Sequence, residues 1–467
     1  MLFLMILTCP FWLWQIQPVK KLNVLIVDKT VPNSSYREHK GLVWILNNDK
    51  YFKNGQVPYS VTEDYKGFEP KDGQKYTIAP IPKDLQKYDV FYLTDQYGVY
   101  KEEFFGQNPS GKRSEKIYGG LKSNEVNQIE KALIQSKGKT LIAEFNTFAS
   151  PTSETAKAKI SNLLNVEWSG WIGRYFSDLN SKEVPEWVKK SYQQQTKKWS
   201  FTGEGFVFVS KNNYVVVIGN KDVQDEGLLF QLTNKGNKYF KQDIQGNYKY
   251  WFDIIDAKDQ NEVLASYKLP ISKQAKETLE GFGIPANFPA VIYHQNTKYS
   301  SYYFSGDFAD ESDVPAIYQT KGLDAWKRNI GANNSFYWKT YVPLMKDILK
   351  NGLHHVDNQE NVELAENDGI KINSKTGDSY IQVRKNGKWE NLLIKGVNMG
   401  IGKPGYFPGE TAITKEEYFR WFKEIGAMNA NAIRIYTLHP PQFYEAFYEY
   451  NQIAKKPLYL FHGTWVN

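Results

Sequence analysis

Continuous apolar runs alternate with amphipathic segments through the first part of the chain. Residues 22–28 (LNVLIVD), 88–95 (YDVFYLTD) and 140–146 (TLIAEFN) are apolar almost to their ends, where a polar residue stands. Such runs are typical of strands buried on both faces of a parallel sheet. Apolar residues at helical spacing predict the intervening helices, over 36–46, 123–139 and 153–165. The alternation of strands and helices predicts an α/β domain with a doubly wound sheet.

Beyond residue 197 the pattern changes to short β-like runs. The runs FVFVS, YVVVIGN, GLLFQLT and NEVLASYKL are separated by turns rich in Asn, Gly, Lys and Asp. We therefore expect an antiparallel, β-rich insertion over roughly 198–290. Two further strands are expected within 289–310, which closes on Asp307 and Asp310, and a last helix over 341–350. The first domain would then extend over 22–350.

A second pattern of strands and helices follows a polar segment. Residues 351–375 show little periodicity and are the best candidate for a linker. Thr414 and Glu417 form a capping box at the start of a predicted helix. The predicted order is strand, helix, strand, helix, strand, over 380–400 (a hairpin running into the first strand), 413–428, 431–441, 442–452 and 457–467. Short connections in this order indicate the first three strands of a (β/α)8 barrel over 376–467. Since a whole barrel takes about 250 residues, we expect the chain to be a fragment of a longer protein.

The first residues are strongly apolar. Between Met1 and Trp14 only Thr8, Cys9 and Pro10 interrupt the large apolar side chains. The run is shorter than the ~20 residues that span a bilayer, and it lacks the basic start of a signal peptide. We expect residues 1–19 to be a signal or membrane anchor, either short or truncated, although a buried strand or helix is the alternative. The protein would then be secreted or membrane-anchored on the extracellular side.

Composition and charge restrict the classes of partner that we expect for this protein. Aromatic residues make up 15% of the chain, which suits sugar-binding surfaces, although an aromatic-rich core gives the same excess. The net charge of +7 is scattered without a dense basic run, so we expect no nucleic-acid partner. The only cysteine, Cys9, excludes an intrachain disulfide and a cysteine-based zinc site. We expect no metal and no organic cofactor.

Polar residues at the predicted strand ends are the candidate ligands of the first domain. Doubly wound sheets bind ligands at the carboxyl ends of their strands, and such residues also serve as caps and turn formers. The residues concerned are Asp28, Asp95, Glu144 and Asn146. The histidines His39, His294, His354 and His355 have no evident partner, and we expect them on the surface or in the linker.

The first domain resembles the class I glutamine amidotransferase-like fold, a flavodoxin-like sheet, through VLIVD, YDVFYLTD, GKTLIAEFNTF and YYFSGDFAD. That family's nucleophile is a cysteine on a sharp turn after the strand that matches TLIAEFN. Here Glu144, Phe145, Asn146 and Thr147 stand at these positions, and a late His-x-Glu pair is missing. The resemblance thus implies the family's shape without its chemistry, and a domain that binds a glycan or packs against the barrel.

The second domain resembles the retaining glycoside hydrolases of clan A, above all family 2 glycosidases and β-1,3-glucanosyltransferases. The matching blocks are IKGVNMG, IGAMNANAIRIYTLHPP and YLFHGTWVN. The resemblance implies that Arg434 holds a catalytic carboxylate, with a plain barrel salt bridge as the alternative. It also implies a substrate-facing rim that contains Asn398, Tyr436, His439, His462 and Trp465. For His439 a core position and for Trp465 a role without sugar stacking remain open.

In clan A the two catalytic carboxylates stand on the fourth and seventh strands, and this chain reaches only the third. The resemblance therefore implies a protein that acts on β-linked polysaccharide by a retaining two-carboxylate mechanism, with this fragment inactive. Its partners would be a polysaccharide or oligosaccharide and, through the N-terminal segment, a membrane. The alternative is a non-catalytic glycan-binding or polysaccharide-assembly protein.

Overall fold

The computed structural model describes residues 2–106, 114–136, 138–196, 198–296, 298–329, 335–353, 365–367, 370–377, 379–385 and 388–463. The chain divides into two compact units, Met1–His354 (unit 1) and His355–Asn467 (unit 2).

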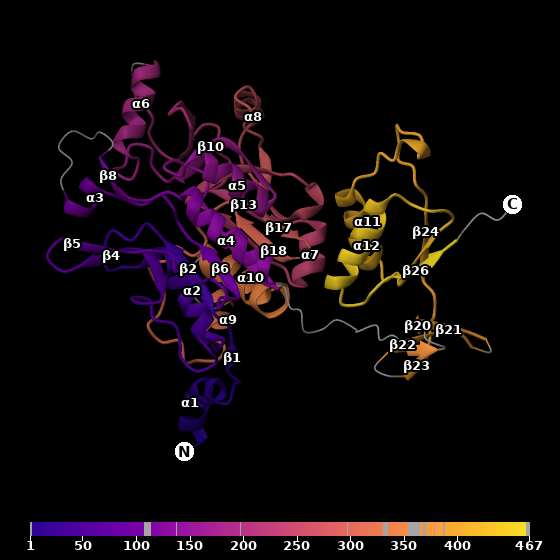
Figure 1. The fold of residues 1–467 in the computed structure, drawn as a ribbon. Helices are drawn as coiled ribbons and strands as arrows, with labels where there is room; N and C mark the ends of the chain where they lie inside the picture. The colour runs from indigo at the N-terminus through magenta and orange to yellow at the C-terminus, as the bar shows by residue number, and fades with distance from the viewer. Residues whose placement is uncertain are drawn as a thin grey trace. The chain divides into compact units, whose positions relative to one another are not determined.

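Unit 1 is an α/β structure built on a mixed ten-stranded sheet (Figure 1). The strand order is β14-β13-β16-β17-β18-β9-β6-β2-β4-β5. The neighbouring strands β4, β2, β6, β9 and β18 are parallel, and the outer strands on both sides pair antiparallel. The bounds are β2 Val24–Asp28, β4 Tyr65–Lys71, β5 Lys75–Ala79, β6 Val90–Leu93, β9 Lys139–Ala143, β13 Leu228–Leu232, β14 Gln245–Tyr248, β16 Val263–Lys268, β17 Asn287–Gln295 and β18 Tyr299–Phe304.

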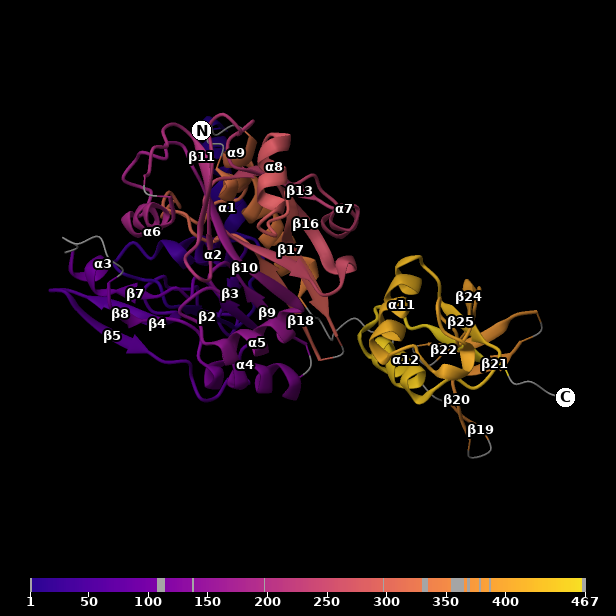
Figure 2. The same cartoon turned by 90° about the horizontal axis from the view of Figure 1, so that it is seen from above.

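Helices cover both faces of the parallel strands. Successive strand residues point to opposite sides, so these apolar strands have an apolar surface on each face. Ile26 packs in one core with Leu42 of α2, whereas Leu25 packs in the other core with Ile129 of α4. Figure 2 shows α4 and α5 together on one side of β2, β9 and β18, with α2 on the other. The helices are α2 Arg37–Asn48, α4 Ser123–Gln135, α5 Glu154–Leu164 and the continuous run η2 Tyr337–Tyr341, α10 Val342–Asp347 and η3 Ile348–Gly352. These positions confirm the helices predicted over 36–46, 123–139, 153–165 and 341–350.

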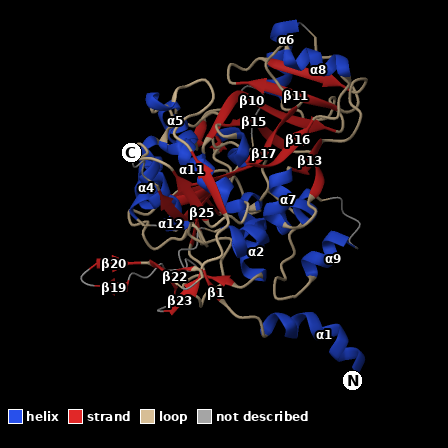
Figure 3. Ribbon diagram, turned by 90° about the vertical axis from the view of Figure 1, so that its right-hand side faces the viewer, coloured by secondary structure: helices blue, strands red, loops and turns tan. Residues whose placement is uncertain are grey.

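The β-rich segment divides between two sheets (Figure 3). β13, β14 and β16 extend the ten-stranded sheet, while β11, β12 and β15 join β10 in a separate antiparallel sheet of order β12-β11-β10-β15. The bounds are β10 Val166–Phe176, β11 Gly205–Ser210, β12 Val215–Gly219 and β15 Trp251–Ala257. The smaller elements are β1 Lys20–Lys21, β3 Tyr51–Phe52, β7 Val99–Tyr100, β8 Lys116–Tyr118, α3 Lys101–Phe105, α6 Glu186–Thr196, α7 Asn234–Phe240, α8 Lys273–Glu280, α9 Leu323–Asn329 and η1 Gln260–Glu262.

The apolar N-terminus forms helix α1, Leu2–Gln15, whose last turn packs against the rest of unit 1. The Trp14 indole is buried and donates a hydrogen bond to the carbonyl of Asn48 at 2.8 Å. The Lys50 ammonium lies 4.3 Å from the Trp14 ring centroid and donates to the carbonyls of Gln15 and Gln17. A cation at the carboxyl end of a helix interacts favourably with the helix dipole. In the part of the chain that is described, no helix combines the length and apolarity needed to cross a membrane.

Unit 2 contains a three-stranded parallel sheet of order β24-β25-β26. This confirms the predicted sequence of strands and helices, and the Thr414–Glu417 capping box is also present. Among the described residues the sheet does not close into a barrel. The bounds are β19 Ala365–Asn367, β20 Ile370–Ile372, β21 Ser374–Thr376, β22 Ile381–Lys385, β23 Lys388–Asn391, β24 Gly396–Met399, η5 Pro408–Glu410, α11 Lys415–Ala427, β25 Ala432–Ile435, α12 Pro441–Ile453 and β26 Tyr459–His462.

Candidate functional site

Buried carboxyl groups gather where the parallel strands of unit 1 end. Parallel strands point their carboxyl ends to the same edge, so residues far apart in sequence meet there. We call this group the acidic edge, and its members are Asp28, Glu38, Asp95, Glu144, Asp307 and Asp310. All six side chains are less than a tenth exposed. Buried carboxyl groups require hydrogen bonds, counter-charges or protons, and the partners of each group therefore indicate its role.

Asp28, the last residue of β2, pairs with His39 of α2. His39 Nδ1 lies 2.5 Å from Asp28 Oδ2, and His39 Nε2 lies 2.8 Å from the carbonyl oxygen of Val61. A carbonyl only accepts, so Nε2 donates to Val61 and one proton lies between Nδ1 and Asp28. His39 is fully buried. The expectation that His39 lies on the surface without a partner is therefore wrong, because its helix packs directly over the end of β2.

Glu144, which follows β9, lies in a network of tyrosines. Tyr92 donates its hydroxyl to Glu144 Oε1 at 2.6 Å, and the Tyr341 hydroxyl lies 2.7 Å from that of Tyr92. The backbone N–H of Ala309 donates to Glu144 Oε2. Burial raises the pKa of Glu144 well above its usual range, although the hydrogen bond from Tyr92 opposes this. Burial therefore opposes ionisation of Glu144, while the hydrogen bonds from Tyr92 and Ala309 favour it.

Asp95 and Asn146 lie at the ends of neighbouring strands. Burial raises the pKa of Asp95 to about 7, and hydrogen bonds from the Tyr97 backbone and the Asn146 side chain hold it from rising further. Asn146 has a φ of 65°, in the left-handed region that Asn tolerates better than most residues. A turn with a left-handed residue therefore follows β9.

Arg37 is the cation of the acidic edge. Its Nη2 donates to Asp310 Oδ2 at 2.5 Å and to the Tyr250 hydroxyl at 2.6 Å, and its Nε donates to Glu38 Oε1 at 3.3 Å. Burial lowers the pKa of Arg37, but the adjacent Glu38 and Asp310 carboxylates outweigh this and raise it. Arg37 therefore stays charged and satisfies one oxygen of each of these two carboxyl groups.

Asp307 and Asp310 also line a cavity of about 410 Å³. Aromatic and charged side chains share its wall, among them Arg174, Tyr248, Tyr250 and Phe336. The Arg174 guanidinium lies 4.6 Å from the centroid of the Tyr250 ring. Burial raises the pKa of Asp310 to about 6, against the effect of Arg37. The cavity is large enough for a small organic ligand, such as one or two sugar rings.

His294 is the second histidine whose surroundings differ from expectation. Its Nδ1 lies 2.9 Å from Glu262 Oε1, and Asn165 donates to the other oxygen of the same carboxylate at 2.8 Å. The prediction that His294 lacks a partner is wrong, since β17 brings it beside the turn that carries Glu262. His354 and His355 lie outside the described residues.

In unit 2 three of the predicted rim residues share the face of the sheet that no described helix covers, which we call the helix-free face. Ile433 and Ile435 of β25 pack into the core formed with α11 and α12, so Arg434 between them points the other way. Asn398 of β24 pairs with Arg434 in register, and the Arg434 guanidinium lies 4.9 Å from the Tyr436 ring centroid. These three side chains are exposed.

The two predicted histidines lie on the helix side instead. The Tyr444 hydroxyl of α12 is 2.7 Å from His462 Nε2 and accepts from the His439 backbone N–H at 3.2 Å. His439 is buried, and its two ring nitrogens lie near the carbonyl oxygens of Thr437 and Gly400. The structure thus separates the candidates into an exposed polar group and a histidine group around Tyr444. Trp465 lies outside the described residues.

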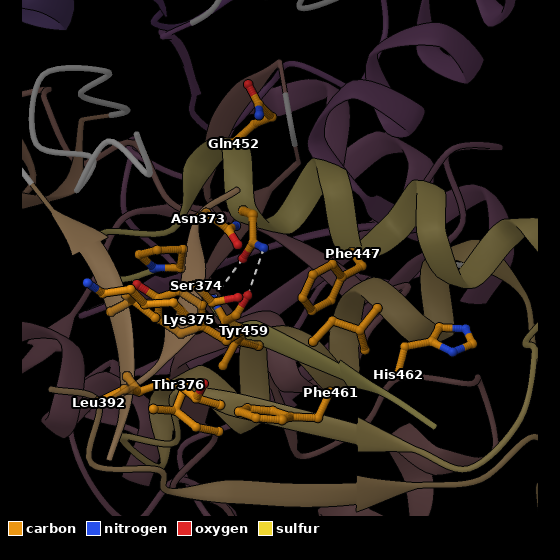
Figure 4. A pocket seen from close by; sticks show the side chains of 16 residues that line it. Asn373, Ser374, Lys375, Thr376, Leu392, Phe447, Gln452, Tyr459, Phe461 and His462 are labelled. Carbon is orange, nitrogen blue, oxygen red and sulfur yellow. Dashed lines mark hydrogen bonds between the residues drawn. The ribbon is translucent and has the colours of Figure 1, made fainter. Parts of the chain in front are cut away.

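A cavity of about 760 Å³ in unit 2 lies along β26. Figure 4 shows Ser374 and Lys375 on one side of it and Phe447 and His462 on the other. Asn451 of α12 holds the start of the strand, because it donates to the carbonyl of Leu458 and accepts from its N–H, both at 2.9 Å. The edge strand and the β21–β22 hairpin therefore border one open groove.

Sequence reasoning missed several residues of the acidic edge and its cavity. Arg37 and Glu38 stand in the first turn of a predicted helix, and Tyr248 and Tyr250 stand in the β-rich segment. In the sequence, the adjacent Arg37 and Glu38 at the start of a predicted helix were the one indication of these residues. The convergence of these residues on Asp307 and Asp310 depends on contacts between distant segments.

A comparison with models of protein families, with curated proteins and with solved structures finds no match to this chain.

Proposed function

We propose that unit 2 is the opening of a (β/α)8 barrel of the clan A glycoside hydrolase type, in a protein that acts on β-linked polysaccharide by a retaining mechanism. One observation carries the proposal: Asn398, Arg434 and Tyr436 lie together on the helix-free face of consecutive parallel strands. In such barrels helices cover the outside, and binding groups stand at the carboxyl ends of the strands.

The three side chains fit that role chemically. The guanidinium of Arg434 suits a paired carboxylate, the Tyr436 ring offers an apolar face to a sugar, and the Asn398 amide both donates to and accepts from hydroxyls. β24, β25 and β26 contain no Asp or Glu. A retaining glycosidase needs two carboxyl groups about 5–5.5 Å apart, so we expect this chain to bind oligosaccharide without cleaving it.

Calorimetric titration of the 467-residue chain with β-1,3- and β-1,4-linked gluco-oligosaccharides tests this function. We expect saturable binding to one of the two and a loss of about tenfold or more in Arg434→Ala, since a charge-assisted contact is worth about 1.5–3 kcal/mol. Arg420→Ala on α11 is the matched control, because it removes the same charge from the helix layer. Absence of binding, or equal losses in both variants, would contradict the proposal.

For unit 1 we propose a doubly wound, amidotransferase-like fold without amidotransferase chemistry. The five adjacent parallel strands, the helices on both faces and the turn at Asn146 support this. Glu144 and Asn146 stand where a cysteine nucleophile would be needed.

A non-catalytic glycan-binding protein is the second candidate, and the cavity of unit 1 favours it. Its wall contains the aromatic side chains of Tyr248, Tyr250 and Phe336 together with Arg174 and Asp310, whose polar groups can hydrogen-bond to hydroxyls. If this cavity holds the sugar, Tyr250→Ala abolishes the calorimetric binding and Arg434→Ala leaves it unchanged. The opposite pattern assigns the sugar to unit 2.

We also propose that α1 attaches the protein to a membrane. Phe11, Trp12 and Leu13 of α1 and Ile16 just after it are exposed, while Trp14 is docked, which leaves an apolar surface for lipid. Flotation of the chain with phospholipid vesicles is the measurement. Replacing Trp12 and Ile16 by Ser should release the protein, and unchanged flotation would exclude this role for α1.

A further inference from the structure

Three carboxyl groups of the acidic edge converge on one point. Glu38 comes from the first turn of α2, and Asp307 and Asp310 come from the segment after β18. One oxygen from each lies within 4.8 Å of the others. Cation–oxygen distances are about 2.3–2.6 Å for Ca²⁺ and about 2.0–2.1 Å for Mg²⁺, so oxygens around one ion stand at most about 5 Å apart. The spacing of the three groups is therefore that of ligands to one ion.

Two of these side chains keep an oxygen without a partner. Glu38 Oε2 and Asp307 Oδ1 are buried and, within the described part of the chain, accept no hydrogen bond. Each side chain belongs to a residue that is only 5% exposed. A buried acceptor without a partner costs about 1–3 kcal/mol, and more for a charged group, so native structures rarely leave one unused. The missing partner is a hydrogen-bond donor or a cation that the described residues do not provide at this point.

The balance of charge around the three carboxyl groups also favours a bound cation. Arg37 is the one cation that contacts this trio among the described residues, and it uses the other oxygen of Glu38 and one oxygen of Asp310. Asp307 has no ion-pair partner among the described residues, so a single guanidinium faces three buried carboxyl groups. The trio therefore needs either bound protons or a bound ion.

We propose that Glu38, Asp307 and Asp310 bind a divalent cation that prefers oxygen ligands, calcium or magnesium. Carboxylates without a neighbouring thiolate or imidazole in the trio favour these hard ions over zinc or copper. The ion reaches the trio from the cavity of about 410 Å³, which Asp307 and Asp310 line. Water in this cavity completes the coordination sphere. The ion neutralises the trio and joins α2 to the segment after β18.

The experiment uses the full chain, stripped with EDTA and titrated with CaCl₂ or MgCl₂ by calorimetry and by thermal unfolding. We expect one ion per chain with either salt and a melting temperature raised by about 5 °C at a hundredfold excess over Kd. Asp307→Asn should weaken binding by about tenfold or more and remove the thermal response. It keeps the shape of the side chain and removes one buried charge, so it should fold.

Two controls distinguish a cation site from a general effect of acidic residues. Asp313→Asn removes an exposed charge from the same segment, and Asp253→Asn removes a buried carboxyl group from β15. Both should bind the ion as the wild type does. No saturable binding up to about 10 mM of either ion would overturn the proposal and assign protons to the trio. A cation response that falls equally in Asp307→Asn and Asp253→Asn would overturn it as well.

Discussion

Unit 1 and unit 2 both place polar side chains at the carboxyl ends of parallel strands, but these side chains are buried in unit 1 and exposed on the sheet of unit 2. At the acidic edge of unit 1 the groups are buried and most have partners in the fold, as Asp28 has in His39. On the sheet of unit 2, Arg434 stays exposed beside Tyr436. The difference arises from what covers the strand ends: α2 and the segment after β18 close over the first, and no described segment covers the second. Burial converts the same residue types from a surface into a coupled electrostatic cluster.

The strongest test of this contrast is His39→Ala. The substitution leaves Asp28 buried without its counter-group, and breaking a buried pair costs about 3–5 kcal/mol. Urea unfolding followed by tryptophan fluorescence measures the loss, with Lys40→Ala on the same helix as a control that changes little. A cost for His39→Ala below about 1 kcal/mol would show that the pair is not electrostatically coupled.

The pH dependence of folding stability at Asp253 on β15 tests how strongly burial affects a carboxyl group. Burial raises its pKa to about 7, although Tyr303 donates a hydrogen bond to it. As pH rises from about 4, the unfolded chain releases this proton while the folded chain keeps it, so folding stability falls until pH reaches about 7. Asp253→Asn removes this loss. Its free energy of unfolding should exceed that of the wild type above pH 7 by at most about 4 kcal/mol, and the two should converge near pH 3. Parallel pH profiles for the two proteins would contradict the burial argument.

Tyr444→Phe examines the histidine group of unit 2. The hydroxyl that joins His462 and the His439 backbone is lost, and a hydrogen bond of this kind contributes about 1 kcal/mol. Urea unfolding measures the change, and Tyr448→Phe, an exposed tyrosine on the same helix, is the matched control. An effect as large as that of His39→Ala would remove the contrast between the two units.

Arg434→Ala should have the smallest effect on stability, within about 0.5 kcal/mol, because the side chain is exposed and its contact with Tyr436 is weakly held. The same variant should lose oligosaccharide binding under the proposed function. Thermal unfolding and calorimetry on one preparation measure both. A large loss of stability would indicate that Arg434 is a structural group and not part of an open binding face.

Local pattern determined most of the elements. The runs LIVD, FYL and TLIA and the helical spacings between them predicted β2, β6, β9, α2, α4 and α5 within a few residues. The capping box at Thr414 and the order of β24 to β26 were also predicted, because caps and periodicity act over a few neighbouring residues. The position of a polar residue at a strand end, as for Asp28 and Glu144, likewise followed from the sequence.

Only the tertiary structure decided which of those residues meet and which are enclosed. His39 has a partner because α2 folds over β2, and Arg37 meets Asp310 across 273 positions of sequence. The β-rich segment divides between two sheets because strand pairing is chosen by long-range contacts, which no local spacing encodes. In unit 2 the alternation of β25 alone implied that Arg434 points away from Ile433. Whether that face is open or covered depends on the segments packed against it, since burial belongs to the assembled fold and not to the strand.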